Sequence, residues 1–148
     1  MINISEAAEN DIDAILKIEQ ESILPPWTHG ALLNEFYRDD SYFIRAQNED
    51  SISGFAILRL SADEAELLRI AVERSYRRKG IAGLLMDAVL HYAKEKELKA
   101  VHLEVRKSNA AAIHLYKKYG FKTVRCRKNY YSHPPEDAAV MIRNSLNT

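Results

Sequence analysis

Cysteine is nearly absent from the sequence, since Cys126 is the only one among 148 residues. A lone cysteine cannot form an intramolecular disulfide or supply a multi-cysteine zinc site, and such usage is typical of a reducing compartment. No apolar run approaches the roughly 18 residues that cross a bilayer. Residues 1–9 lack the basic and apolar regions of an export signal. We therefore expect a soluble cytoplasmic protein with no membrane partner.

Net charge is also absent, because 21 lysines and arginines balance 21 aspartates and glutamates. No direct nucleic-acid binding is expected, and any anion site must be local. The five histidines lack ligand spacing of the H-E-x-x-H kind, so no metal is expected. The five glycines form neither G-x-x-x-x-G-K-S/T nor G-x-G-x-x-G, which argues against P-loop and Rossmann nucleotide sites.

Repeats, low-complexity segments and Gly/Ser-rich linkers are missing too, which indicates a single domain over residues 1–148. Asn10 and Thr28 are expected to cap the first two helices, the second ending near residues 38–40. A third amphipathic helix starts near Gly80, and Gly120 closes a fourth that begins at Asn109. Strands are predicted at 2–4, 41–46, 54–60, 64–72, 101–105, 121–126 and 138–142, with an antiparallel meander from 41 to 72.

The loop before the third helix carries the clearest binding signal. Three consecutive cations precede two glycines at a helix N-terminus, where unpaired N–H groups and the helix dipole attract anions. Gly80 and Gly83 let a phosphate approach the backbone closely. The alternative is a basic helix start whose glycines serve tight packing.

The segment Arg77-x-x-Gly80-x-Ala82, after the strand ending at Val72, resembles the Arg/Gln-x-x-Gly-x-Gly/Ala acyl-CoA signature of the GCN5-related N-acetyltransferase (GNAT) family. The order of strand, loop, amphipathic helix, strand and Asn-led helix is also that of the family, over nearly the whole chain. The resemblance implies a mixed α/β GNAT fold with a central, mostly antiparallel sheet of six to seven strands and about four helices. It also implies that strands 64–72 and 101–105 splay apart.

Acetyl-CoA is the cosubstrate that this resemblance implies. Backbone groups that would bind its pantetheine arm, one of them polarising the thioester carbonyl, belong to Ile70, Ala71 and Val72. The residues that would bind its diphosphate are Arg77, Arg78, Lys79, Gly80, Ile81, Ala82 and Gly83. Asn109 matches a family residue that bonds the cofactor, with a plain N-cap as the equal alternative.

Glu104 is the candidate base, because it lies in an otherwise apolar strand where burial would raise its pKa. From the residues alone, a solvent-facing Glu104 and a core Tyr116 are the simpler interpretations. The run from Leu103 to Tyr116 is similar to that of bacterial ribosomal-protein-alanine N-acetyltransferases and their N-terminal acetyltransferase relatives. That resemblance makes Glu104 the general base and Tyr116 the general acid, and Tyr116 a cofactor contact. His102 and His114 flank this site, and packing or exposure explains each more simply than proton transfer.

Four residues are candidates for binding the acceptor. Tyr130 and Tyr131 precede a Pro-Pro turn and resemble the substrate loop of N-terminal acetyltransferases, with packing over a sheet edge as the equal alternative. Trp27, in a Pro-rich loop between the first two helices, either lines the opening through which the acceptor would enter or fills the core. Glu66 has weaker support. The basic triplet Arg125, Arg127 and Lys128 is interpreted as a solvated face.

The function expected from these observations is acetyl transfer to the N-terminal α-amine of a protein, by direct attack. The resemblance gives ribosomal protein S18, with an N-terminal alanine, as the candidate acceptor. We expect a monomer or weak dimer. Acetylation of a small amine or a lysine side chain, and a noncatalytic acyl-CoA-binding module, are the alternatives.

Overall fold

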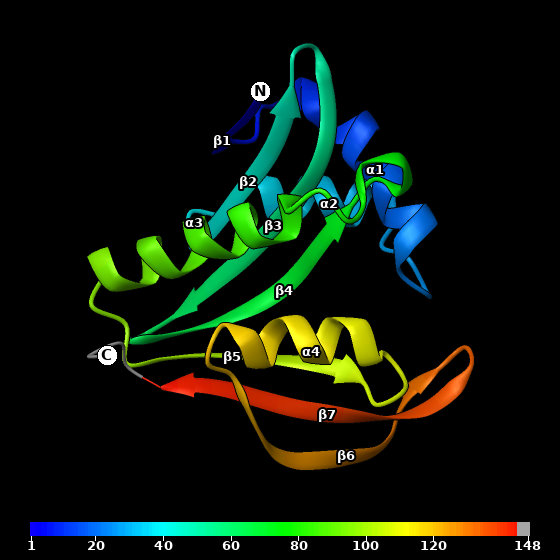
Figure 1. The fold of residues 1–148 in the computed structure, drawn as a ribbon, viewed down its shortest axis with the longest axis vertical. Helices are drawn as coiled ribbons and strands as arrows, with labels where there is room; N and C mark the ends of the chain where they lie inside the picture. Colours follow the sequence, from blue (N-terminus) through cyan, green and yellow to red (C-terminus); the bar gives the residue numbers. More distant parts are fainter. Residues whose placement is uncertain (145–148) are drawn as a thin grey trace.

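The computed structural model describes residues 1–144 and confirms the mixed α/β architecture (Figure 1). One seven-stranded sheet has the order β1-β2-β3-β4-β5-β7-β6. The strands are β1 (Ile2–Glu6), β2 (Ser41–Asn48), β3 (Ser51–Ser61), β4 (Glu64–Val72), β5 (Ala100–Arg106), β6 (Lys122–Ser132) and β7 (Pro135–Asn144). The helices are α1 (Ile12–Ser22), α2 (His29–Phe36), α3 (Ile81–Glu95) and α4 (Ala110–Lys118), with 3-10 turns at η1 (Glu9–Asp11) and η2 (Arg74–Tyr76).

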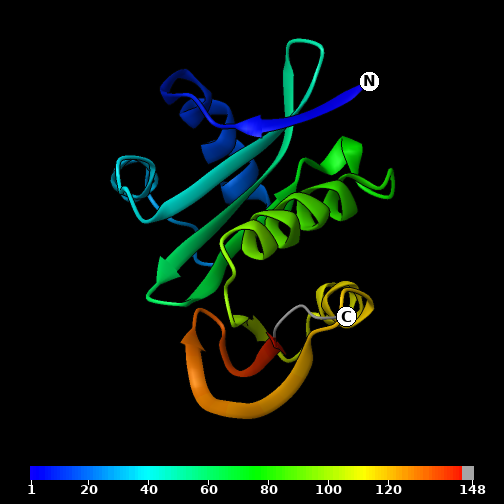
Figure 2. The same ribbon diagram turned by 90° about the vertical axis from the view of Figure 1, so that its left-hand side faces the viewer.

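The helices cover the sheet from both sides. Figure 2 shows α1 and α2 on one side and α3 and α4 on the other. One buried cluster joins Leu85 and Val89 of α3 to the sheet and reaches Tyr116 of α4, and a second joins Ile15 of α1 and Leu32 of α2 to the opposite face. Each face of the central strands is therefore apolar, which explains the nearly continuous hydrophobic sequence of β3.

The predicted meander is confirmed, since β2, β3 and β4 pair antiparallel in chain order. Two helix starts differ in outcome. The Thr28 side chain accepts a hydrogen bond from the Ala31 N–H at 3.1 Å, so that N-cap is confirmed. The expected cap at Asn10 is wrong, because Asp11 occupies the position and its carboxylate accepts from the Ala8 N–H within the preceding 3-10 turn. The second helix also ends at Phe36, before the predicted stop.

A bulge in β4 changes which side chains face α1. The ladder with β3 passes from Leu67 to Arg69 while β3 advances by one residue. Ala65 and Leu67 face the α3 side before the bulge, and Ile70 and Val72 face it afterwards. Because strand side chains alternate, this one-residue insertion directs Arg69 toward α1.

Among residues 1–144, no helix has both the length and the apolar character required to span a membrane.

Candidate active site

The site forms where β4 and β5 separate. These parallel strands pair only between residues 64–66 of β4 and residues 100–102 of β5. On its other edge, β5 pairs with β7 along its whole length. Beyond Glu66, no described strand pairs with the β5-facing edge of β4, and Figure 1 shows the two strands diverging. Backbone groups on that edge, along 67–72, are therefore available to an extended ligand.

The loop 77–83 enters α3 through Gly80, whose φ of +81° is in the left-handed region. The first intrahelical bond runs from the Leu84 N–H to the Gly80 carbonyl, so the N–H groups of 81–83 have no helical acceptor. The guanidinium of Arg77 does not face this terminus, because it donates to the Val72 carbonyl (3.1 Å) and to Ser22 (3.1 Å). Arg77 therefore shapes the loop through its side chain.

Gly83 has a packing role that the sequence left as the alternative. The Tyr119 hydroxyl donates to the Gly83 carbonyl at 3.3 Å, and a Cβ added at Gly83 would lie 2.8 Å from that hydroxyl oxygen. No atom lies within 4 Å of a Cβ added at Gly80. The two glycines thus differ: Gly80 supplies a backbone conformation, and Gly83 supplies space between α3 and α4.

Glu104 lies on β5 between Leu103 and Val105, which point into the α3 cluster, so its side chain faces the α1 side. Its side chain is 15% exposed, and Oε2 accepts a hydrogen bond from Nη1 of Arg127 at 2.6 Å. This bond raises the pKa of Arg127. Arg125, Arg127 and Lys128 are exposed, as a solvated face requires, but Arg127 also gives Glu104 a cationic neighbour in addition to its apolar strand neighbours.

Tyr116 lies on the other side of the sheet, packed in the α3 cluster beside Phe121 with ring centroids 5.9 Å apart. Burial raises the pKa of its hydroxyl far above the usual value, and the charge of Tyr131 raises it further. The hydroxyl is therefore a proton donor throughout the neutral range. At the start of the same helix, Asn109 is an N-cap that accepts from the Ala112 N–H at 3.1 Å.

Tyr130 and Tyr131 lie in β6, which extends beyond the predicted strand 121–126 and ends at Ser132, before the turn at His133 and Pro134. The β6–β7 ladder passes from Arg127 to Tyr131 while β7 advances two residues, so the strand bulges between them. The two rings meet edge-on at 5.0 Å, and the Arg127 guanidinium stacks on Tyr130 at 4.4 Å. Burial raises the pKa of Tyr131 to about 12, and that of Tyr130 also rises, from burial and then from its hydrogen bond to Glu104.

Glu66 and His102 lie opposite each other in the short β4–β5 ladder, at the point where the strands separate. Glu66 projects from β4 toward the α1 side, because Ala65 and Leu67 on either side of it face the α3 cluster, and its charge contributes to raising the pKa of Arg127 and Tyr130. Glu66, Glu104, Arg127 and Tyr130 therefore gather at the end of the gap on the α1 side. His114 lies on α4, on the other side of the sheet.

Trp27 is held by an ion pair that the sequence analysis missed. Glu19 of α1 is fully buried, accepts from the Trp27 backbone N–H at 2.8 Å and pairs with Nε of Arg69 at 3.0 Å. The Arg69 guanidinium also stacks over the indole of Trp27 at 4.3 Å. The signal was an arginine in an apolar strand and a glutamate on the apolar face of a helix, two charges that burial forces to pair.

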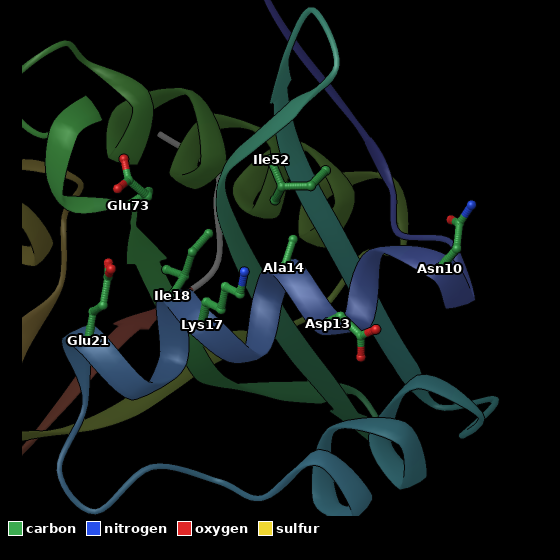
Figure 3. A pocket seen from close by; sticks show the side chains of 8 residues that line it. All are labelled: Asn10, Asp13, Ala14, Lys17, Ile18, Glu21, Ile52 and Glu73. Carbon is green, nitrogen blue, oxygen red and sulfur yellow. The ribbon is translucent and has the colours of Figure 1, made fainter.

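A surface hollow of about 440 Å³ lies elsewhere, beside α1 (Figure 3). Figure 3 shows Ala14, Lys17 and Ile18 of α1 facing Ile52 of β3, with Glu73 nearby. Mixed charges line this hollow, and it includes no candidate residue. Within residues 1–144, no three side chains of His, Cys, Asp or Glu gather as a metal site would require.

Known proteins resemble this chain in both sequence and fold. Residues 12–121 match the model of the Acetyltransferase (GNAT) family. The ribosomal protein bS18-alanine N-acetyltransferase of Haemophilus influenzae is 38% identical over 142 residues, covering 93% of this chain and 95% of its own. The crystal structure of the ribosomal-protein-S18-alanine N-acetyltransferase from Escherichia coli superposes with a TM-score of 0.92 at 31% identity, covering 100% and 97% of the two chains. Ard1 from Thermoplasma volcanium gives a TM-score of 0.91 at 34% identity, covering 99% of each.

Proposed function

Because the chain belongs to the GNAT family of acetyltransferases, we propose that it acetylates the N-terminal α-amine of a protein. Enzymes of this family use acetyl-CoA, which supplies an acyl group activated as a thioester. The relatives from H. influenzae and E. coli are named for the alanine of ribosomal protein bS18. We propose the same class of acceptor for this chain, with the N-terminus of bS18 as the first candidate.

The residues fit acetyl-CoA in two respects. Along the unpaired β4 edge, in the stretch of Ile70, Ala71 and Val72, alternate backbone groups face away from β3 toward an amide-bearing arm, and the Val72 carbonyl already accepts from Arg77. The N–H groups of Ile81, Ala82 and Gly83 have no helical acceptor and point out of the start of α3, as a diphosphate requires. Arg78 and Lys79 of the same loop add positive charge. Asn109 adds a polar group at the start of α4.

Glu104 is proposed as the general base. An α-amine with a pKa near 8 is mostly protonated at neutral pH, so a base must remove a proton before attack. Glu104 lies on the α1 side of the gap, beside Glu66, Tyr130 and Tyr131, where an acceptor would enter. The incoming ammonium replaces the guanidinium of Arg127 as the partner of this carboxylate, so the charge beside Glu104 is conserved.

Tyr116 is proposed as the general acid. The departing thiolate has a reference pKa near 8.5 and is a better leaving group when protonated. The raised pKa of the Tyr116 phenol keeps it protonated between turnovers. Tyr116 lies on the face of the sheet opposite Glu104. What carries the proposal is that a carboxylate and a phenol approach the separated strands from the two faces of the sheet.

The test is acetylation of three acceptors followed by mass spectrometry: an N-terminal bS18 peptide, the same peptide with a blocked α-amine and an added lysine, and spermidine. We expect acetylation of the free α-amine alone. Glu104→Gln and Tyr116→Phe should each lower kcat by about 100-fold or more, while calorimetry shows CoA binding unchanged. Glu95→Gln and Tyr37→Phe, at exposed positions away from the gap, are the matched controls. Preferred acetylation of spermidine or the lysine would overturn the acceptor class, and full turnover in both variants would overturn the two roles.

A further inference from the structure

Arg106 lies between the α1–α2 loop and the β6–β7 loop, which flank the place where the acceptor is proposed to enter. It is two residues after Glu104 on β5, so both side chains project from the same face of the strand. Its side chain is only 16% exposed, and Nη1 pairs with Glu136 at 3.3 Å. The guanidinium also stacks on the ring of Tyr131 at 4.4 Å.

The same guanidinium binds backbone carbonyls of both loops. Nη2 donates to the carbonyl of Leu24, in the α1–α2 loop, at 3.0 Å, and to that of His133, between β6 and β7, at 3.3 Å. Nη1 donates to the Pro134 carbonyl at 2.8 Å. Leu24 and Pro134 are far apart in the sequence, and Arg106 is the side chain that connects them.

We propose that Arg106 is a positioning residue that clamps the α1–α2 loop to the β6–β7 end and so fixes the width of the acceptor mouth. This inference rests on the proposed function, because the mouth has a role only if a peptide enters it. Trp27 lies in the α1–α2 loop on one wall, and Tyr131 lies near the end of β6 on the other. The clamp holds both walls at a fixed distance from Glu104, because Arg106 lies on the same strand as the base and itself makes the bonds to the Leu24, His133 and Pro134 carbonyls.

An arginine suits this position for a geometric reason. Its planar fork presents donors in two directions at once, and its face stacks on an aromatic ring. A lysine ammonium at Arg106 would keep the charge, but it carries its three donors on one nitrogen and has no planar face, so it cannot bridge the Leu24 and Pro134 carbonyls while stacking on Tyr131. The guanidinium of Arg106 also satisfies the hydrogen-bonding capacity of the Leu24 and Pro134 carbonyls. At this partly exposed site, water would otherwise bind these carbonyls and separate the walls.

Loss of the clamp should affect acceptor binding and spare the cofactor. The proposed diphosphate and pantetheine groups lie on the β4 edge and at the start of α3, whereas Arg106 contacts the α1–α2 loop and the β6–β7 end. A shift of about an ångström in a group that positions the substrate can lower the rate of a reaction by up to about 100-fold. We therefore expect Arg106→Gln and Arg106→Lys each to raise KM for the peptide about tenfold, with KM for acetyl-CoA unchanged.

The chain contains a native reporter, because Trp27 is its only tryptophan and lies in the α1–α2 loop. Acrylamide quenching of Trp27 fluorescence in the free protein measures how well that loop is held. We expect the quenching constant to rise about twofold in Arg106→Gln and Arg106→Lys, because a released loop opens more often. Lys107→Gln, a change at the exposed next residue, is the matched control and should leave quenching and both KM values at the wild-type level.

Two results would overturn the clamp: wild-type quenching in both Arg106 variants, or a KM for acetyl-CoA that rises as much as that for the peptide. Thermal melting accompanies each variant, and if Arg106→Gln melts below the assay temperature, Arg106→Lys carries the test. The quenching measurement needs no substrate. A wild-type protein that acetylates no peptide would therefore overturn the proposed function, while the loop attachment would be decided separately by Trp27.

Discussion

Nη1 of Arg127 lies 2.6 Å from Oε2 of Glu104, so the proposed base holds a cation before any acceptor arrives. The Arg127 side chain is about half exposed and stacks on Tyr130, whereas Glu104 is mostly covered. An acceptor ammonium must therefore compete for Glu104 with the Arg127 guanidinium, which can remain stacked on Tyr130 when it is displaced. Displacing the guanidinium is a cost that acceptor binding must overcome.

Removing this competitor should improve acceptor binding. An ion pair with an exposed partner is weak, so Arg127→Gln should lower KM for a peptide with a free α-amine by no more than about fivefold. Steady-state kinetics at fixed saturating acetyl-CoA measures this change. Arg125→Gln, at an exposed position on the same strand, is the control and should keep the wild-type KM. A higher KM in Arg127→Gln would mean that Arg127 itself binds the acceptor.

The buried pair of Glu19 and Arg69 should dominate the stability of the α1 side. Glu19 is fully buried, and Glu19→Gln leaves the mostly buried guanidinium of Arg69 without its counter-charge. Such removal of one partner costs about 3–5 kcal/mol in the free energy of unfolding, measured by urea denaturation. Glu21→Gln, at an exposed position on the same helix, should change that free energy by less than about 0.5 kcal/mol. A loss below about 1 kcal/mol in Glu19→Gln would show that Arg69 finds water or another partner.

Gly83 and Tyr119 should be coupled in stability. Gly83→Ala removes a helical glycine, which favours folding by about 0.5–1 kcal/mol, but its Cβ would lie 2.8 Å from the Tyr119 hydroxyl. The ring must then move and its bond to the Gly83 carbonyl is lost. Tyr119→Phe removes the clash, so Gly83→Ala should be stabilising by about 0.5–1 kcal/mol only in the Tyr119→Phe background.

A double-mutant cycle by thermal or urea unfolding measures this coupling. Additive changes would mean that the helices separate freely at this contact. Gly80→Ala is the contrasting change, since no atom opposes the new Cβ but φ is +81°, and it should destabilise the fold by about 1 kcal/mol in either background.

Local patterns predicted most of the fold. The 3.6-residue periodicity of α3, the side-chain cap of Thr28 and the strand at 64–72 depend on neighbours in sequence, and the structure confirms them. The extension of β6 through Tyr131 was missed because its residues are mostly exposed, so no apolar alternation marks the strand. A bulge opposite β7 interrupts the alternation further, and only pairing with β7 defines the strand.

The candidate site was predicted less completely than the fold. Glu104 is a carboxylate in an otherwise apolar strand, but its proposed role, like that of Tyr116, came from the resemblance to N-terminal acetyltransferases and not from the residues alone. Arg69, Arg106 and Arg127 did not stand out, because an arginine in a strand is ordinarily a surface residue. Their partners are Glu19, the Leu24 and Pro134 carbonyls and Glu104, all from distant segments of the chain. Such partnerships depend on the bulges of β4 and β6, and no local sequence pattern specifies them.

Tyr116 should make the protein sensitive to alkaline unfolding. Its pKa in the folded state lies above the value near 10 of the unfolded chain, so above pH 10 the unfolded state binds fewer protons than the folded state. The free energy of unfolding should therefore be constant up to about pH 9 and then fall, with a slope approaching about 1.4 kcal/mol per pH unit for this one residue. Tyr131, with a folded pKa of about 12, should add to the fall between pH 10 and 12. Urea denaturation from pH 7 to 12 should show a shallower alkaline decline in Tyr116→Phe than in the wild type, and a still shallower one when Tyr131→Phe is added. Parallel wild-type and Tyr116→Phe curves above pH 10 would mean that burial does not raise the pKa of Tyr116 in the folded protein.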